Sequence, residues 1–224
     1  LVVTPADGGT VAEIAYRPRA FNVVNSLRRR PEPYHVKLRE AQRGGRGAES
    51  IHDRVVSKEQ GLENYLHYDR YNRHAFRSMV FGAGRSLDEY RQGRLEESAE
   101  MAGGRFHIVS AAGDRCVLEH RAADCPCEAT SQIVVRGSSV EARWRLRNSG
   151  LAELKGGLEL VLNLLAPDAR DRYFILPDAG QRQRLGWSGE AQGEAVALVD
   201  EWLDLRIDAR VSPAAVWWIY PIYT

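Results

Sequence analysis

Hydrophobic and polar residues alternate with a period of two over much of the chain, which is the pattern of strands buried on one face. In the clearest stretch, an apolar row alternates with a charged row: Val140, Ala142, Trp144 and Leu146 against Glu141, Arg143, Arg145 and Arg147. Residues 10–17 alternate in the same way, directly after a Gly-Gly turn. The pattern predicts antiparallel strands with one buried and one wet face, and it places Trp144 in the core.

The same pattern predicts two hairpins and several further strands. Residues 105–122 are typical of two strands around a turn at 112–114, and residues 131–148 repeat this arrangement around 137–139. Further strands, separated by Gly, Pro and Asp turns, are predicted at residues 156–167, 172–176, 195–211 and 216–223. We therefore expect a mainly β chain.

Helical periodicity is confined to the first half of the chain. Residues 57–76 carry apolar and aromatic residues at roughly helical spacing, interrupted at Gly61. Residues 40–50 have the composition of a loop, and residues 85–104 that of a polar connector. We expect one or two short helices.

Composition narrows the class of protein. A chain of 224 residues suits one large all-β domain or two small ones. Lys and Arg total 31 against 30 Asp and Glu, so the net charge of +1 provides no field that would attract nucleic acid. No run of 18 apolar residues is present that would suit a membrane span. We expect neither nucleic acid nor a membrane as a partner.

The candidate metal ligands lack the usual spacings. Cys116, Cys125 and Cys127 include a Cys-Pro-Cys pair, which has neither zinc nor thioredoxin spacing, and indicate reduced thiols in a cytoplasmic protein. The six histidines show no HExxH or HxH pair. The motifs of serine hydrolases, nucleotide hydrolases and dinucleotide-binding proteins are also absent. The sequence predicts no metal and no cofactor.

Aromatic and planar polar residues crowd together over residues 65–74. Aromatic rings stack on the apolar face of a sugar while forked polar groups take its hydroxyls, so this mixture suits sugar binding. An amphipathic helix whose tyrosines cover a sheet explains the same pattern.

Short motifs follow one another in a recognisable order. Arg28 to Arg30 precede Pro-Glu-Pro-Tyr-His at 31–35, and then come Ser-Ile-His-Asp at 50–53 and Leu-His-Tyr-Asp-Arg at 66–70. This series resembles the C-terminal β-domain of family 57 glycoside hydrolases, of the α-amylase and 4-α-glucanotransferase type. The resemblance continues through Leu-Glu-Leu-Val-Leu-Asn-Leu at 158–164 and through the final residues, 216–224.

The resemblance implies an accessory domain. In that family the catalytic carboxylates, which retaining chemistry needs ~5–5.5 Å apart, lie in an N-terminal, incomplete β/α barrel. Residues 1–224 would then form one antiparallel β-sandwich similar to the galactose mutarotase supersandwich, cut from a longer enzyme, with no catalytic residue of its own. The expected partners are that barrel and an α-glucan or maltooligosaccharide, and a homo-oligomer stays open.

Seven residues on long excursions from the sandwich are the candidate site: Tyr34, His35, His52, Asp53, Tyr68, Asp69 and Arg73. On one hypothesis they form the face that meets the barrel and borders its α-glucan cleft. On the other, they form a polar network that ties the excursions to the sheet.

Two other classes of function fit parts of the sequence. A free-standing aldose mutarotase or epimerase would need an acid and a base, drawn from His107 or His120 with Glu119. A carbohydrate-binding module would use an exposed ring as a stacking platform, with Trp187, Trp202, Trp217 and Trp218 as candidates.

Overall fold

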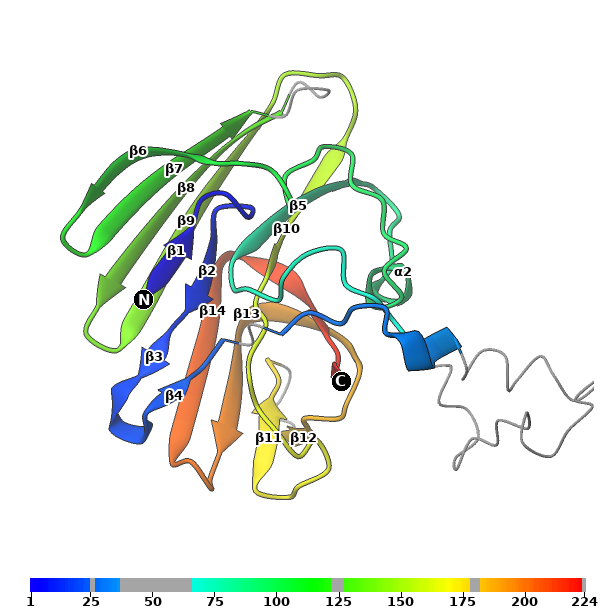
Figure 1. The fold of residues 1–224 in the computed structure, drawn as a ribbon, viewed down its shortest axis with the longest axis vertical. Helices are drawn as coiled ribbons and strands as arrows, with labels where there is room; N and C mark the ends of the chain where they lie inside the picture. The colour runs from blue at the N-terminus through cyan, green and yellow to red at the C-terminus, as the bar shows by residue number, and fades with distance from the viewer. Residues whose placement is uncertain (25–26, 37–65, 122–126, 178–181, 223–224) are drawn as a thin grey trace, which may run out of the picture.

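Antiparallel strands make up most of the protein in the computed structural model, which describes residues 1–24, 27–36, 66–121, 127–177 and 182–222 (Figure 1). The helical elements are the 3-10 turn η1 (Arg17–Arg19), a helical turn at 33–36 and α2 (Leu87–Arg91). The strands are β1 (Val2–Thr4), β2 (Thr10–Glu13), β3 (Ala15–Tyr16), β4 (Phe21–Asn22), β5 (Arg77–Gly82), β6 (His107–Ala112), β7 (Arg115–Arg121), β8 (Cys127–Arg136), β9 (Ser139–Asn148), β10 (Leu154–Glu159), β11 (Arg172–Ile175), β12 (Arg182–Arg184), β13 (Gly189–Asp200) and β14 (Leu205–Ile219). The prediction of a mainly antiparallel β protein with short helices is confirmed.

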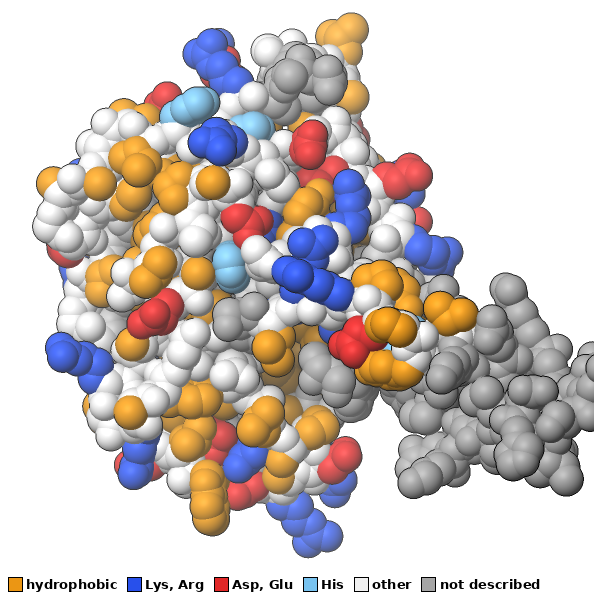
Figure 2. Space-filling view, in the orientation of Figure 1, with side chains coloured by type: hydrophobic (Ala, Val, Ile, Leu, Met, Phe, Trp, Pro, Cys, Tyr) orange, Lys and Arg blue, Asp and Glu red, His pale blue; other side chains and the backbone are white. Residues whose placement is uncertain are grey.

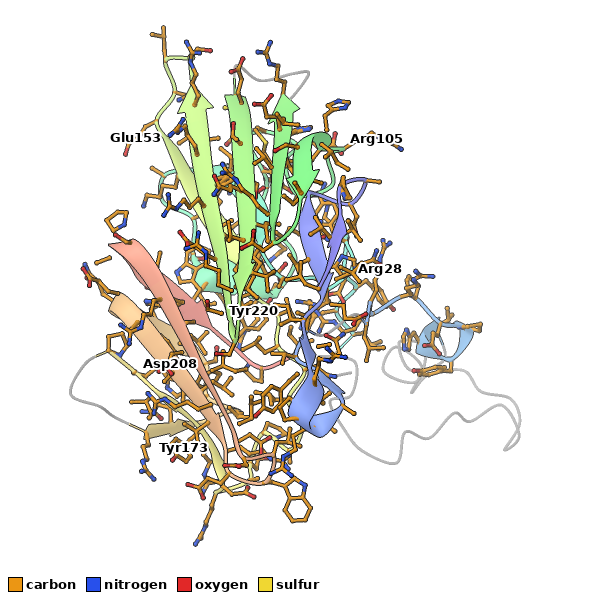
Figure 3. All side chains as sticks on the ribbon, turned by 90° about the vertical axis from the view of Figure 1, so that its left-hand side faces the viewer. Arg28, Arg105, Glu153, Tyr173, Asp208 and Tyr220 are labelled. Atoms are coloured by element: carbon orange, nitrogen blue, oxygen red, sulfur yellow. The ribbon has the colours of Figure 1, made fainter. Side chains whose placement is uncertain are left out.

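Two four-stranded sheets carry the architecture, in the orders β6-β7-β8-β9 and β12-β11-β13-β14. Three two-stranded pairs, β1-β2, β3-β4 and β5-β10, accompany them. Figure 3 shows β6 to β9 in the upper half of the molecule and β13 with β14 in the lower half. Both predicted hairpins are confirmed, since β6 pairs with β7 and β8 pairs with β9 around short turns.

The alternation seen in the sequence sets which face of the first sheet is buried. In β8 the inward row is buried, and its partners in β9 are Ala142, Trp144 and Leu146. Trp144 packs against the main core, as predicted. Its ring lies where a side chain at Gly156 would be, because a Cβ built there would stand 2.4 Å from the ring.

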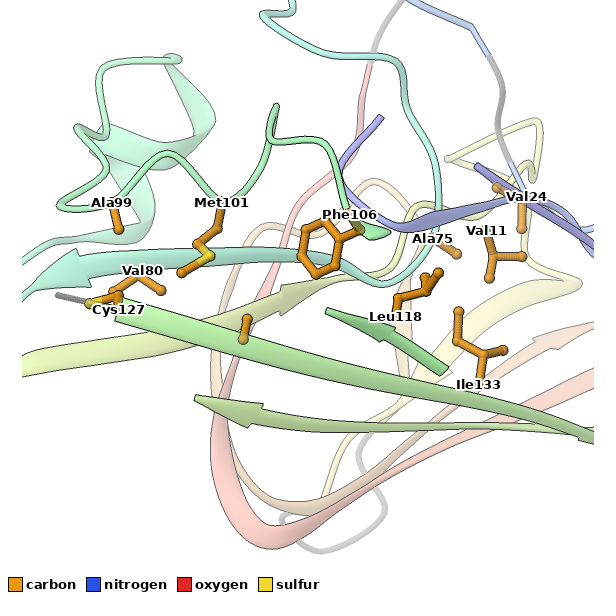
Figure 4. Packing of buried hydrophobic residues seen from close by; sticks show 11 residues of the cluster. Val11, Val24, Ala75, Val80, Ala99, Met101, Phe106, Leu118, Cys127 and Ile133 are labelled. Atoms are coloured by element: carbon orange, nitrogen blue, oxygen red, sulfur yellow. The ribbon is translucent and has the colours of Figure 1, made fainter. Parts of the chain in front are cut away.

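The main hydrophobic core lies between this sheet and the layer made by β2, β5 and the segment before β6 (Figure 4). Leu118 on β7 and Ile133 on β8 meet Val11, Ala75 and Val80 from that layer, all with at most 1% of their surface exposed. A smaller core under β13 and β14 contains Leu176, Ala191, Val196 and Ile219. Trp187 and Trp217 pack against this second core.

Four predicted elements differ from the structure. The strand expected at 195–211 is divided between two strands, because the turn at 201–204 separates β13 from β14. The helix expected over 57–76 is wrong in its described part, because residues 66–74 are irregular and β5 begins at Arg77. The strand expected at 156–167 is β10, which begins earlier, at Leu154, and ends earlier, at Glu159. The strand expected at 216–223 is the continuation of β14, whose residues around Pro213 bulge opposite β13.

The predicted connector at 85–104 contains α2. Ser86 caps this helix, because its hydroxyl accepts a hydrogen bond from the Glu89 N–H while the Glu89 carboxylate accepts one from the Ser86 N–H. This capping box is readable in the sequence as Ser-x-x-Glu. In the described ranges, no helix has the length and apolar character needed to cross a membrane.

Candidate functional site

Two segments far apart in the sequence, residues 27–36 and 66–73, are tied to one another. The exposed guanidinium of Arg28 donates hydrogen bonds to two backbone carbonyl oxygens of the second segment, at 3.1 and 2.8 Å. Two backbone hydrogen bonds add to these, from Asp69 to Arg29 at 3.0 Å and from Arg73 to Leu27 at 3.3 Å. The arginine run that stood out in the sequence therefore joins two excursions of the chain.

Asp69 is the centre of a buried ion network, which it forms with Arg29, Arg73 and Glu159. One oxygen of Asp69 accepts a hydrogen bond from the Arg29 N–H at 2.8 Å, and the other accepts one from its guanidinium, also at 2.8 Å. Arg73 binds the same carboxylate through Nη2 and reaches Oε1 of Glu159 through Nη1 at 3.4 Å. Only 5% of the Asp69 side chain and 10% of the Arg73 side chain are exposed. Each of these buried charges has an opposite charge beside it.

The ion network moves the pKa values of its two carboxyl groups in opposite directions. Burial would raise the pKa of Asp69, but hydrogen bonds from Arg73 and Arg29 outweigh burial and hold it below its ordinary value. Burial raises the pKa of Glu159, although the charge of Arg73 and a hydrogen bond with Tyr90 oppose that rise. Opposite displacements of this kind also occur in catalytic acid/base pairs.

The surroundings do not suit a catalytic pair. Both carboxylates are bound to the same guanidinium, that of Arg73. The pocket beside them, also lined by Tyr68, Tyr71 and Arg77, has a volume of about 80 Å³. Pockets that bind small molecules usually have volumes of about 300–1,000 Å³. Within the described part of the chain, this pocket is therefore too small to hold a glucosyl unit against the carboxylates.

Aromatic rings cover the ion network on one side. Tyr90 from α2 meets Tyr220 edge-on, with ring centroids 5.8 Å apart, and lies 6.0 Å from Trp218. Trp218 in turn stacks on Phe81 of β5 at 5.8 Å. Burial raises the pKa of both tyrosine hydroxyls. The residues that follow β14 thus help to shield the ion network from water.

Tyr34, His35 and Tyr68, which we call the aromatic trio, lie next to one another. The His35 ring meets Tyr34 edge-on with centroids 4.3 Å apart and lies 5.7 Å from the Tyr68 ring. The Tyr68 hydroxyl is 3.2 Å from Nδ1 of His35. Tyr34 is 54% exposed. The trio therefore presents an aromatic face and polar edges at the surface.

A second buried polar cluster explains the Gly-Gly turn. The Arg77 side chain is 1% exposed and donates hydrogen bonds to Asp7 at 3.0 Å, to the carbonyl oxygen of Asn72 at 2.9 Å, and to the carbonyl oxygen of Ala102. Gly8 stands against the same group with φ at +71°, and a Cβ there would lie 2.4 Å from that Ala102 oxygen. Only glycine fits this conformation and this space.

The structure assembles part of the predicted site. It brings Tyr34, His35 and Tyr68 together and places Asp69 with Arg73 in the ion network. His52 and Asp53 lie outside the described residues. Sequence reasoning missed four partners, of which Glu159 left a signal as the single acid in the apolar run 158–164. Arg29 belongs to the arginine run that stood out in the sequence, whereas Tyr90 and Tyr220 left no such signal.

Of the acid and base pairs considered for a mutarotase, His120 and Glu119 lie on opposite faces of β7, whereas His107 lies directly opposite Glu119 across β6 and β7. His120 faces the core side of β7, where its ring stacks on Phe106 at 4.9 Å and both nitrogens lie within 3.1 Å of backbone carbonyl oxygens. Glu119 and His107 are exposed and are cross-strand partners, so they share the face of the sheet that is turned away from His120. The described residues contain no group of three or more His, Cys, Asp or Glu arranged to hold a metal.

The fold is that of a β-rich domain. The polar residues of its candidate site are paired mainly with one another. The chain belongs to the family described as alpha-amylase/4-alpha-glucanotransferase, C-terminal, whose model matches residues 1–224. The resemblance inferred from the short motifs is thereby confirmed.

Individual relatives are much longer than this chain. Alpha-amylase 1 of Dictyoglomus thermophilum is 30% identical over 234 residues, covering 100% of this chain and 33% of its own length. The 4-alpha-glucanotransferase of Thermococcus kodakarensis is 24% identical and covers 100% and 32%. The crystal structure of the 4-alpha-glucanotransferase from Thermococcus litoralis has the same fold, with a TM-score of 0.73 at 17% identity over 98% of this chain and 31% of that one. The chain thus spans about a third of these proteins.

Proposed function

We propose that this chain is the non-catalytic C-terminal domain of an enzyme that acts on α-glucans, of the α-amylase or 4-α-glucanotransferase type. In this proposal residues 1–224 form one accessory domain with the sandwich architecture of galactose mutarotase. It packs against a catalytic barrel encoded in the same protein. Membership of the family supports this proposal, together with the names and lengths of the relatives.

The observation that carries the proposal is a set of exposed apolar side chains on segment 27–36. Leu27, Tyr34 and Val36 are 59%, 54% and 56% exposed. Figure 2 shows hydrophobic side chains gathered over the helical turn at 33–36, on the side of the molecule away from the sheets. Clustered exposed apolar side chains of this kind mark surfaces that meet another protein part.

The ion network gives this surface a fixed shape. Because Asp69 binds both the backbone and the guanidinium of Arg29, segment 27–36 is held without an apolar core beneath it. A preformed surface loses less conformational entropy when it docks than a flexible one does. The buried residues of the candidate site therefore act as positioning residues for the surface above them.

The aromatic trio is the part of this surface that suits the edge of a glucan cleft. Its rings offer flat apolar faces, and its hydroxyl and imidazole groups offer hydrogen bonds to sugar hydroxyls. In this proposal the trio borders the α-glucan cleft of the catalytic barrel, while Asp69 and Arg73 stay buried beneath it.

A matched pair of variants of the full-length protein tests the docking. Val36→Asp should lower its unfolding free energy by about 2 kcal/mol, because docking would bury this side chain. Leu151→Asp is the control, because Leu151 is fully exposed in the loop between β9 and β10 and should change stability by less than about 0.5 kcal/mol. Equal effects of the two substitutions on thermal unfolding would contradict docking through segment 27–36.

A further inference from the structure

The turn between β13 and β14 presents one large aromatic ring to solvent. Trp202 lies in this four-residue turn and is 74% exposed. A large ring that is exposed at a defined place offers a flat apolar face and an indole N–H to a ligand.

The other four tryptophans have structural roles. Trp144 packs on the main core, and Trp187 packs on the second core. Trp217 packs on the same second core and donates its indole N–H to the carbonyl oxygen of Gly193 at 2.9 Å. Trp218 stacks on Phe81. Of the rings considered for sugar stacking, Trp202 is therefore the one whose faces are open.

The turn that carries Trp202 is rigidly held on both sides of the ring. Before it, the Glu201 N–H donates to the carbonyl oxygen of Asp171 at 2.9 Å. After it, the Leu203 N–H donates to Asp200 at 2.9 Å, and Arg19, from the other end of the chain, donates to the Leu203 carbonyl oxygen at 3.0 Å. The backbone that carries the ring is thus held in place, which reduces the entropy lost on binding a weak ligand.

The size and surroundings of the ring favour a sugar over a protein partner. One aromatic side chain offers about 150–250 Å², whereas a stable protein interface buries about 800 Å² on each partner. The flanking groups are charged and wet: Asp204 is 89% exposed, and it pairs with Arg19, itself 48% exposed, at 3.6 Å. A flat apolar face bordered by a forked donor and a carboxylate matches one pyranose ring with its hydroxyls.

We propose that Trp202 is a stacking platform for a glucosyl unit of a long α-glucan chain, with Arg19 and Asp204 as hydrogen-bonding partners of the sugar hydroxyls. The choice of an α-glucan rests on the proposed function. The site lies at the end of the molecule opposite the loop between β9 and β10 (Figure 1).

Affinity electrophoresis of the full-length protein through gels containing amylopectin tests the platform. We expect Trp202→Ala to raise the apparent dissociation constant about tenfold, the loss of one aromatic contact. Trp202→Phe should recover part of the retardation, because a phenyl ring keeps a stacking face. Leu151→Ala is the control for loss of an exposed apolar side chain, and it should migrate like the unchanged protein.

Two outcomes would overturn the platform. One is equal retardation of Trp202→Ala and the unchanged protein. The other is protection of Trp202 from acrylamide quenching in the full-length protein without glucan, because that would show the ring to be covered by another part of the protein. Conversion of maltooligosaccharides by the unchanged protein is measured separately. Failure of that reaction would count against the proposed function. If the reaction proceeds and either of the two outcomes above is observed, the platform alone is contradicted.

Discussion

The carboxylate of Asp69 holds Arg29 twice, through the backbone N–H and through the guanidinium, each at 2.8 Å. One side chain thus fixes both the path of segment 27–36 and the direction of its arginine. Arg29 reciprocates, because its carbonyl oxygen accepts the Asp69 N–H at 3.0 Å. The pairing of Asp69 with Arg29 therefore sets the rigidity of segment 27–36.

Replacing Asp69 by Asn should destabilise the protein strongly. The substitution keeps the shape of the side chain but leaves the buried Arg73 without its main opposite charge, which typically costs about 3 kcal/mol or more. Asp208→Asn is the matched control, because Asp208 is 43% exposed and its pair with Arg206 is worth about 1 kcal/mol at most. Urea unfolding of both variants measures the difference, and similar losses would refute a special role for the ion network.

The two carboxyl groups of the ion network should act on stability in opposite pH ranges. The folded-state pKa of Asp69 lies below 3.8, so its contribution is present above that pH and is lost as the pH falls through the folded pKa. The folded-state pKa of Glu159 lies above 4.5, so the folded state binds the proton more tightly and stability decreases as the pH rises from 4.5 through the folded pKa.

The Glu159→Gln variant isolates the second effect. Because Gln does not titrate, its stability relative to the unchanged protein should increase as the pH rises from 4.5. Chemical unfolding at a series of pH values gives this difference directly. A difference that is constant over the range would mean that Glu159 has an ordinary pKa in the folded protein.

Gly8→Ala should be far more costly than Gly113→Ala, although both glycines have positive φ, at +71° and +58°. At Gly8 the added Cβ would lie 2.4 Å from the Ala102 carbonyl oxygen, whereas at Gly113 nothing stands within 4 Å. We expect a loss of about 3 kcal/mol at Gly8 from strain and overlap together, and of about 1 kcal/mol at Gly113. Thermal unfolding of the two variants separates crowding from backbone conformation.

A second pair of glycines tests the packing of Trp144. Gly156→Ala would place its Cβ 2.4 Å from the ring, and overpacking of this kind costs about 1–3 kcal/mol. Gly82 lies in the partner strand β5 with nothing within 4 Å of an added Cβ. Gly82→Ala should therefore be neutral or slightly stabilising. Near-UV circular dichroism of Trp144 should change in the first variant alone.

The alternation of apolar and polar residues correctly predicted the strands whose two faces differ most in polarity. The alternation of Val140 to Arg147 fixed the face of β9, and the turns at 112–114 and 137–139 fixed two hairpins. The helix expected over residues 57–76 failed in its described part because aromatic residues at near-helical spacing, such as Tyr68 and Tyr71, serve instead as partners of His35 and Glu97. Tertiary contacts decided what periodicity could not.

In the candidate site, too, local motifs were predicted and tertiary contacts were not. Asp69 and Arg73 were found because their motif is local, whereas their partners Arg29 and Glu159 come from distant strands and segments. A period of two says only that Glu159 alternates along β10. It does not identify the charged residue that pairs with Glu159, which is Arg73.

The ion network joins residues from three separate parts of the chain, Arg29, Asp69 with Arg73, and Glu159, and Tyr220 covers it from a fourth part. We expect contacts between residues this distant in sequence to form late in folding, because the loops between them must close first. Loss of the ion network should therefore leave the refolding rate nearly unchanged and accelerate unfolding. The buried charges then contribute little to the folding nucleus, and they act mainly by setting the lifetime of the folded domain.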